Sequence, residues 1–284
     1  MRVIGIGDNV CDKYEHQGTM YPGGQVLNYT VYATMLGAEA AYIGVFGTDE
    51  VAEHVMNTLD RHGIDRSRCR QYEGENGCAR VTLVDGDRVF LGSNKGGVLR
   101  EHPIVLDDED LAYIRGFRHC HVSNNSYMDG QLPRLKETGI SVSYDFSGQW
   151  TDPERVERVA PYIDFAFFSA GSAGAEVTED TLRKLSAMGV GISIATRGSK
   201  GALLYDGRDF YEQPPKLVEA VDTLGAGDSF ATAFLLSWLE DRDAAERDPS
   251  SRPALLRKAL EKAAEFSSGT CLVYGAFGEG KQYI

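Results

Sequence analysis

Short apolar runs alternate with longer amphipathic stretches along most of the chain. The runs are rich in Val, Ile, Phe and Tyr and have the length of strands. They cover residues 2–7, 41–46, 117–122, 140–146, 164–169 and 191–196. From residue 107 onward they alternate with helical patterns, which is typical of a parallel sheet covered by helices. The pattern therefore predicts an α/β fold in which a central parallel sheet is sandwiched between helices.

Residues 69–95 have a different pattern. Two runs of strand-forming residues, 79–84 and 88–91, flank Asp85-Gly86-Asp87, a sequence that favours a tight hairpin turn. With residues 13–21, these strands would form a small antiparallel sheet that projects from the main body. We interpret residues 1–284 as one domain, with the inserted segments 13–21 and 69–95 forming this sheet. A second hairpin is predicted around Asp206-Gly207.

A glycine-rich turn precedes the long apolar helix expected at residues 230–238. The turn reads Gly225-Ala226-Gly227 and is followed by Asp228. Such a turn presents backbone N–H groups at the positive end of a helix dipole, where phosphate or a developing anion binds. An acid beside it can take a proton from a hydroxyl while the phosphate charge is held nearby. The alternative is that Asp228 only caps the helix.

A second glycine pair precedes an earlier helix. Gly23 and Gly24 allow close approach of a ligand, and Asn28 lies one turn into the helix. Asp8 and Asp12 follow the first strand, at the end where open α/β sheets bind ligands. Carboxylate and amide groups together can bind the hydroxyls of a polyol. The alternative interpretation is that Asp8 and Asp12 belong to an ordinary turn and bind no ligand.

Composition and charge narrow the class of protein. Of the 284 residues, 42% are hydrophobic and 25% are charged, as in an ordinary globular protein, and no apolar run is long enough to span a membrane. The N-terminus has no signal-peptide pattern. The net charge of −13 argues against a general nucleic-acid binder or a binder of anionic membranes. Five cysteines without a C-x-x-C pair indicate reduced thiols and a cytoplasmic protein.

Two familiar kinds of site are excluded. Gly5–Val10 begins like a dinucleotide fingerprint, but Val10 stands where the third glycine is needed and no helix follows. No Walker A spacing occurs either. His119 and His121 share one strand face, but no further residues have metal-site spacing, so we interpret both as structural.

Two signatures resemble those of the ribokinase-like (PfkB) carbohydrate kinases. One is Asp222-Thr223 with Gly225–Asp228, and the other is Gly23-Gly24 followed by Asn28, in the order that the family has. The resemblance implies a three-layer α/β sandwich with a mostly parallel sheet and a small β-sheet lid. It also implies phosphoryl transfer from ATP, with Mg²⁺, to a primary hydroxyl of a sugar.

The resemblance assigns roles to single residues. Asp228 is implied as the catalytic base, and Gly225, Ala226 and Gly227 as the anion hole. The implied acceptor contacts are Asp8, Asp12, Gly23, Gly24 and Asn28, with Arg80 and Lys95 from the lid. The implied ATP contacts are Ser169, Thr196, Gly198 and Gly201, with Ala263 and Ser267 leaving room for adenine. A monovalent cation, K⁺, is implied near Asp222 and Thr223, and a homodimer through the lid is expected.

One motif of the family is missing. The family places an Asn-x-x-Glu motif, which organises Mg²⁺, where this chain has Ser169-Ala170-Gly171-Ser172. The Mg²⁺ ligands therefore stay open, with Glu176 or Glu179 as replacements.

Within the family, four stretches are similar to the fructoselysine 6-kinases: Ile6–Asn9, Asp85–Phe90, Tyr144–Trp150 and Asp164–Ala170. This similarity implies fructoselysine or a related fructosamine as the acceptor. An acidic site suits a cationic sugar amine, whereas Lys95 would suit a carboxylate. Fructose, a nucleoside or a sugar acid is the alternative acceptor, and a non-catalytic regulator that binds a sugar or nucleotide is the alternative of another class.

Overall fold

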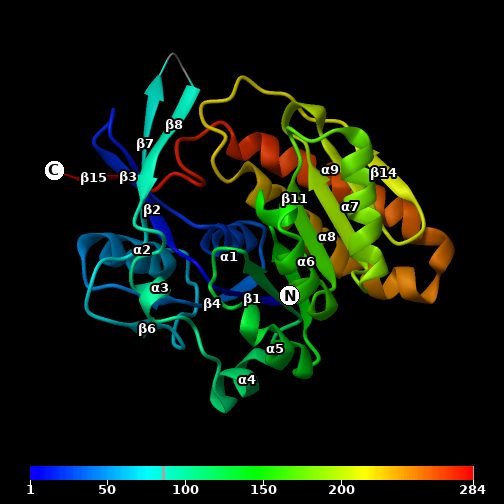
Figure 1. Ribbon diagram of the computed structural model, residues 1–284, viewed down its shortest axis with the longest axis horizontal. Helices are drawn as coiled ribbons and strands as arrows, with labels where there is room; N and C mark the ends of the chain where they lie inside the picture. Colours follow the sequence, from blue (N-terminus) through cyan, green and yellow to red (C-terminus); the bar gives the residue numbers. More distant parts are fainter. Residues whose placement is uncertain (85–86, 284) are drawn as a thin grey trace.

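The computed structural model describes residues 1–84 and 87–283, and its main body is built around an eight-stranded sheet (Figure 1). The strands follow the order β14-β13-β12-β11-β10-β9-β1-β4. The parallel strands are β1 (Arg2–Ile6), β4 (Glu39–Ile43), β9 (His119–Ser123), β10 (Ser141–Asp145), β11 (Phe165–Ser169) and β12 (Ile192–Thr196). The antiparallel hairpin of β13 (Ala202–Tyr205) and β14 (Phe210–Gln213) extends one edge. The predicted mostly parallel sheet is confirmed.

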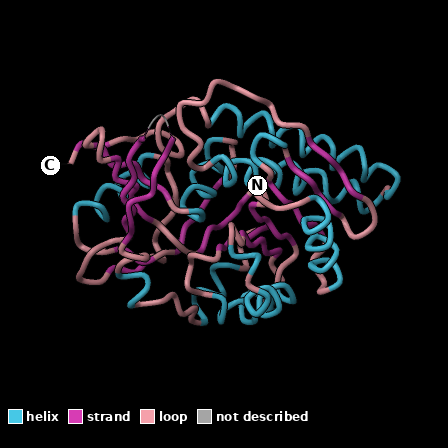
Figure 2. Tube along the Cα trace, turned by 45° about the horizontal axis from the view of Figure 1, so that its top comes forward, coloured by secondary structure: helices cyan, strands magenta, loops and turns pink. Residues whose placement is uncertain are grey.

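Helices cover both faces of this sheet (Figure 2). Along β11, Phe165 and Phe167 belong to one buried cluster, whereas Ala166 and Phe168 belong to the other, as the two-residue repeat of a strand requires. The first cluster includes residues of α1 (Gln25–Met35), α2 (Glu50–Arg61), α8 (Ala226–Arg247) and α9 (Arg252–Thr270). The second includes residues of α3 (Val98–Glu101), α4 (Asp108–Ile114), α5 (Leu132–Glu137), α6 (Pro153–Val159) and α7 (Ala175–Ala187). The sheet is therefore the middle of three layers.

A smaller five-stranded sheet projects from the main body and has the order β15-β3-β2-β7-β8 (Figure 1). Its strands are β2 (Val10–Tyr14), β3 (Thr19–Gly23), β7 (Cys78–Val84), β8 (Asp87–Ser93) and β15 (Lys281–Gln282). The turn expected at Asp85-Gly86 lies outside the described residues. β15, which pairs with β3, was not expected from the sequence.

The expectation that this sheet is wholly antiparallel is wrong for one pair. β2 and β7 are parallel, with Cys11 opposite Cys78 and Tyr14 opposite Val81. Parallel neighbours need a long crossover, and here the crossover contains β3, α1, β4 and α2. The apolar run 41–46 is also divided at Gly44, over which the Tyr42 ring packs: a Cβ there would lie 2.4 Å from Tyr42 Cε1. Val45–Phe46 form the separate strand β5, which pairs with β6 (Arg70–Gln71).

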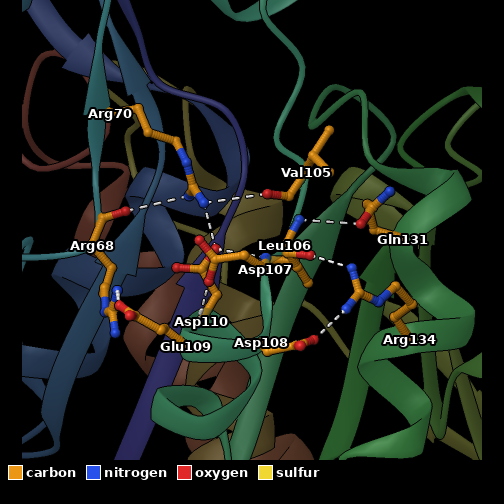
Figure 3. Close-up of polar contacts among 10 residues, drawn as sticks. All are labelled: Arg68, Arg70, Val105, Leu106, Asp107, Asp108, Glu109, Asp110, Gln131 and Arg134. Carbon is orange, nitrogen blue, oxygen red and sulfur yellow. Dashed lines mark hydrogen bonds and ion pairs between the residues drawn. The ribbon is translucent and has the colours of Figure 1, made fainter.

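A cluster of charged residues holds α4 against its neighbours (Figure 3). Asp107 caps α4, accepting from the Asp110 backbone N–H at 2.8 Å, while Asp110 accepts from the Asp107 N–H at 3.1 Å. Arg70 of β6 binds the buried Asp110 carboxylate. Arg134 of α5 binds Asp108 at 2.9 Å. The charges in this cluster pair with one another, so the cluster stabilises the fold and is no candidate for a ligand site.

Candidate functional site

Two cavities meet at the N-terminus of α8, beyond the carboxyl ends of the parallel strands. The smaller has a volume of about 370 Å³, and Leu224 and Asp228 line it. The larger has a volume of about 500 Å³, and Thr223, Ala226 and Gly227 line it. The turn that opens α8 therefore separates two ligand-sized spaces while reaching into both.

Gly225 begins α8 in a conformation that only glycine adopts easily. Its φ of 74° is left-handed, and a Cβ there would lie 2.5 Å from Tyr32 Oη and 2.8 Å from Ala276 Cβ. The Tyr32 hydroxyl donates to the Ala276 carbonyl, so this neighbourhood is held in place. The first N–H groups of a helix have no intrahelical acceptor, and the Gly227 backbone lines the larger cavity. A helix N-terminus of this kind can hold an anion.

Asp228 is hydrogen bonded to a side chain of α1. Asn28 Nδ2 donates to Asp228 Oδ2 at 2.7 Å, and both residues line the smaller cavity. Asn28 and Tyr32 lie four residues apart on the face of α1 that meets the α8 turn. The buried Asn28 Oδ1 has no hydrogen-bond partner among the described residues, which is uncommon for a buried polar atom.

Buried acids surround Asp228 and change its proton affinity. Burial and the negative charges of the nearby Asp145, Asp8 and Asp12 together raise the pKa of Asp228 to about 8, although the hydrogen bond from Asn28 acts in the opposite direction. Burial also raises the pKa of Asp145 to about 6. A carboxylate with a pKa near neutrality is a better base than an exposed one, which suits the removal of a proton from a hydroxyl.

Asp8 has a structural task that the sequence did not reveal. Its carboxylate accepts from the Gln25 N–H at 2.8 Å and the Val26 N–H at 3.4 Å, and so caps α1. It also accepts from Ser123 Oγ at 2.7 Å. Burial raises the pKa of Asp8 above its usual value. Asp8 lines the smaller cavity, but most of its accepting capacity is used within the protein. Ser123, at the carboxyl end of β9, was missed, although its place after a strand was a usable signal.

The remaining predicted acceptor residues divide into two groups. Asp12 and Gly24 line the smaller cavity, and Gly23 lies beside them, where a Cβ would be 2.8 Å from Asp12 Oδ2. Arg80 and Lys95 are not among the lining residues. The Arg80 side chain instead binds Glu15 at 2.6 Å, while Cys78 and Ala79 are the residues of β7 that line the cavity. The sequence analysis missed several lining residues, among them Gln25, Phe90, Asn125 and Tyr127.

Lys95 is exposed at the turn after β8. Its backbone carbonyl accepts from Tyr127 Oη at 2.7 Å, so the turn, and not the ammonium group, is tied to the cavity wall.

The larger cavity contains most of the residues predicted to contact ATP. Ser169, Thr196, Gly198, Gly201 and Ser267 line it. Ala263 is instead fully buried in the core, and its neighbour Ala264 lines the cavity, because adjacent helical residues face different ways. The apolar lining of residues 214–220 was missed, since an irregular loop carries no periodic pattern. This loop contributes Pro214, Pro215, Leu217, Val218 and Ala220.

The structure shows where Asp222, Glu176 and Glu179, the acids considered near a metal ion, lie relative to the two cavities. Asp222 accepts from Leu224 N–H at 3.0 Å and Gly275 N–H at 3.1 Å, and also from the Tyr14 hydroxyl. Glu176 and Glu179 do not line the larger cavity. Among residues 1–84 and 87–283, no cluster of three or more His, Cys, Asp or Glu side chains could hold a metal ion.

The same part of the chain, residues 1–84 and 87–283, has no helix with the length and apolarity needed to cross a membrane.

His119 and His121 lie in the core. His119 Nε2 and His121 Nδ1 are 2.8 and 2.7 Å from Ser143 Oγ, and the Tyr29 ring stacks on His121 with 4.5 Å between centroids. Burial lowers the pKa of His121 to about 3 and that of His119 well below its usual value.

Comparisons with known proteins show which family the chain is similar to. The pfkB family carbohydrate kinase model matches residues 1–276. The chain is 39% identical over 284 residues to fructosamine kinase FrlD of Bacillus subtilis, covering 100% of this chain and 95% of that protein. It is 33% identical over 233 residues to fructoselysine 6-kinase of Escherichia coli, covering 82% of this chain and 87% of that protein.

Solved structures show the same fold. The structure of Arabidopsis thaliana ribokinase complexed with ribose and ATP superposes with a TM-score of 0.81 at 20% identity, covering 98% of this chain and 95% of that one. A putative ribokinase II from E. coli in complex with ATP and Mg²⁺ superposes with a TM-score of 0.78 at 21% identity, covering 97% and 94%. The predicted ribokinase-like three-layer fold is therefore confirmed.

Proposed function

Because the chain belongs to the pfkB family of carbohydrate kinases, we propose that it transfers a phosphoryl group from ATP to a primary hydroxyl of a fructosamine. Fructoselysine is the acceptor that we favour. The observation that carries the proposal is the position of Asp228. Its carboxylate lines the smaller cavity, and the glycine turn directly before it lines the larger one. A base on one side and an anion site on the other are the two parts that phosphoryl transfer needs.

The proposed reaction assigns each cavity to one substrate. ATP occupies the larger cavity, with its phosphates toward the α8 turn and its base against the apolar loop 214–220. The acceptor occupies the smaller cavity, where Asp228 takes the proton of the attacking hydroxyl. Within the turn Gly225-Ala226-Gly227, the Gly227 backbone N–H stabilises the charge on the transferred group, since the Ala226 N–H already donates to the Thr223 carbonyl at 3.3 Å. Mg²⁺ bound with ATP supplies further neutralisation of the phosphate oxygens. Asn28 orients Asp228 through the 2.7 Å hydrogen bond and accepts from an acceptor hydroxyl at Oδ1.

The chemistry of the smaller cavity supports an amine-bearing sugar. Asp8, Asp12 and Asp228 line it, and none of its described lining residues is cationic. An acidic wall attracts the ammonium group of a fructosamine and repels the carboxylate of a sugar acid. The same preference is consistent with the names of the two curated relatives described above, which act on fructosamines.

Further proposals concern the small sheet, the pairing of two chains, a K⁺ site and the location of the protein. We propose that the small sheet is a lid over the acceptor and that two chains pair at the free edge of β8, where Phe90 and Leu91 are exposed. K⁺ is proposed beside the backbone of Asp222 and Thr223. A cytoplasmic location is proposed because all five cysteines are free thiols.

The test is ADP release on a panel of acceptors: fructoselysine, a fructosamine of another amine, fructose, a nucleoside and a sugar acid. The proposal expects kcat/KM to be highest with a fructosamine and to require Mg²⁺. Asp228→Asn serves as the inactive control. Preference for fructose, a nucleoside or a sugar acid would replace the proposed acceptor. Sugar binding without ADP release from any acceptor would instead support a regulator.

A further inference from the structure

Asp222 joins three segments that are far apart in the sequence. Its Oδ1 accepts from the Leu224 N–H at 3.0 Å, and its Oδ2 accepts from the Gly275 N–H at 3.1 Å. The Tyr14 hydroxyl, from β2 of the small sheet, donates to the same Oδ2. One carboxylate therefore connects the small sheet, the turn after α9 and the loop that enters α8.

The loop held by Asp222 leads directly into the anion-binding turn. Leu224 lines the smaller cavity, and Thr223 lines the larger one. The Ala226 N–H donates to the Thr223 carbonyl at 3.3 Å, so the loop conformation sets where the first amides of α8 point. Ala276, next to the bound Gly275, packs against Gly225, where a Cβ would meet it at 2.8 Å. A shift at Asp222 would therefore move the anion-binding turn.

Tyr14 links this loop to the acceptor side. Its ring is 1% exposed and packs edge-on against Tyr21, with 5.0 Å between centroids. Asp12 lies two residues earlier on the same face of β2 and lines the smaller cavity. Tyr14 itself lines neither cavity. It can influence the reaction only through the groups it holds.

We propose that the Tyr14 hydroxyl is a positioning group for phosphoryl transfer, acting through Asp222 on the turn at Gly225–Gly227. This inference rests on the proposed kinase function and adds a residue to it. A charge-assisted hydrogen bond from a buried, rigid ring restrains the carboxylate to one orientation. Without that bond, Asp222 keeps its two backbone donors but loses the hydrogen bond that comes from β2. The amides would then be aligned for the transferred group in a smaller fraction of complexes.

The experiment compares Tyr14→Phe with the matched control Tyr21→Phe. Both rings lie in the same sheet and touch each other, but the Tyr21 hydroxyl donates to Gln17 Oε1 at 3.0 Å, within the sheet. We expect Tyr14→Phe to lower kcat by about ten- to a hundredfold, as misplacement of reacting groups does, with KM for ATP and for the acceptor nearly unchanged. Tyr21→Phe should keep the kcat of the unmodified protein. Equal kcat values for the two variants, or a Tyr14→Phe effect confined to KM, would overturn the proposal.

A double-mutant cycle with Asp222→Asn tests whether the two residues act together. If Tyr14 acts through Asp222, the double variant should be no slower than Asp222→Asn alone, whereas multiplied losses in kcat would overturn the inference. Thermal unfolding of each variant separates lost alignment from lost structure, and Tyr14→Phe should stay folded at the assay temperature. If the unmodified protein transfers no phosphoryl group to any acceptor, the proposed function fails. If it does and Tyr14→Phe matches it, only the positioning role fails.

Discussion

Replacing Asp228 with Asn should change activity and stability in opposite directions. The substitution keeps the size of the side chain, and the amide oxygen of Asn can still accept from Asn28 Nδ2, which now donates to Asp228 at 2.7 Å. It removes the only feature that the base role requires, a carboxylate that can take a proton. It also removes a charge that lies among Asp145, Asp8 and Asp12.

The stability change follows from the raised pKa of Asp228, about 8 in the folded protein against 3.8 as its ordinary value. Between these two values the folded state holds a proton that the unfolded state releases, so this group costs stability as pH rises from about 4 to 8. A tenfold difference in proton affinity between the folded and unfolded states corresponds to about 1.4 kcal/mol. The Asp228→Asn variant does not lose this unfolding free energy, because the amide side chain does not ionise. We expect it to be more stable than the unmodified protein by roughly 2–5 kcal/mol at pH 8 and by much less at pH 5.

The activity change is larger and has the other sign. Loss of a general base lowers kcat by about a hundred- to ten-thousandfold. In the unmodified protein, kcat/KM should rise with pH and level off above about 8, because the free enzyme must have Asp228 ionised. ATP binding should be nearly intact, since the larger cavity is lined by other residues.

Denaturant unfolding of both proteins at pH 5 and pH 8, combined with ADP release and ATP binding, measures these effects. The unmodified protein at each pH is the control. Ordinary turnover by Asp228→Asn would refute the base assignment. A stability difference that does not grow with pH would refute the claim that burial and the neighbouring acids raise its pKa.

Four further predictions concern the site, the core and the small sheet. Gly225→Ala should destabilise the protein by about 2 kcal/mol or more in thermal unfolding, because φ is 74° and Tyr32 Oη lies 2.5 Å from the new Cβ. In Gly227→Ala the new Cβ meets nothing within 4 Å, so this variant should keep the stability of the unmodified protein and lower kcat. Asn28→Ala should weaken acceptor use much more than ATP use, and equal effects on the two KM values would contradict its place in the acceptor site. The difference in unfolding free energy between the unmodified protein and His121→Gln should shrink by about 1.4 kcal/mol for each pH unit as pH falls from 6.5 to 4.5. The reason is that the lowered pKa of His121 leaves the folded state without a proton that the unfolded state binds. A pH-independent difference in denaturant unfolding would contradict this. Light scattering should give a mass near twice 31.1 kDa if the protein is a dimer. Amide hydrogen exchange in β7 should become slower when a fructosamine binds, if the small sheet is a lid. A monomeric mass, together with an exchange rate in β7 that does not change when the acceptor is added, would contradict both the dimer and the lid.

Local patterns were sufficient to predict the alternation of strands and helices and the glycine turn before the long helix. A strand buried on both faces, such as β11, needs a continuous apolar run, and that run is visible in the sequence. The turn at Gly225–Gly227 was also visible, because a left-handed residue at a helix start requires glycine and the acid follows it directly. The roles of Asn28 and Asp228 came from the resemblance to a family, and the hydrogen bond between the two side chains was found only in the structure.

The direction in which each side chain points was decided by the tertiary structure. Arg80 and Ala79 differ by one position, yet Ala79 lines the smaller cavity and the Arg80 side chain binds Glu15, which the sequence alone does not reveal. Asp8 is placed to cap α1 only because β1 ends beside that helix.

The link from Tyr14 through Asp222 to Gly275 likewise joins residues that no local pattern relates. The sequence by itself determined which segments become strands, helices and tight turns, since those depend on neighbouring residues. Which faces of these segments meet depends on the register and packing between distant parts of the chain. Only the folded structure contains that information.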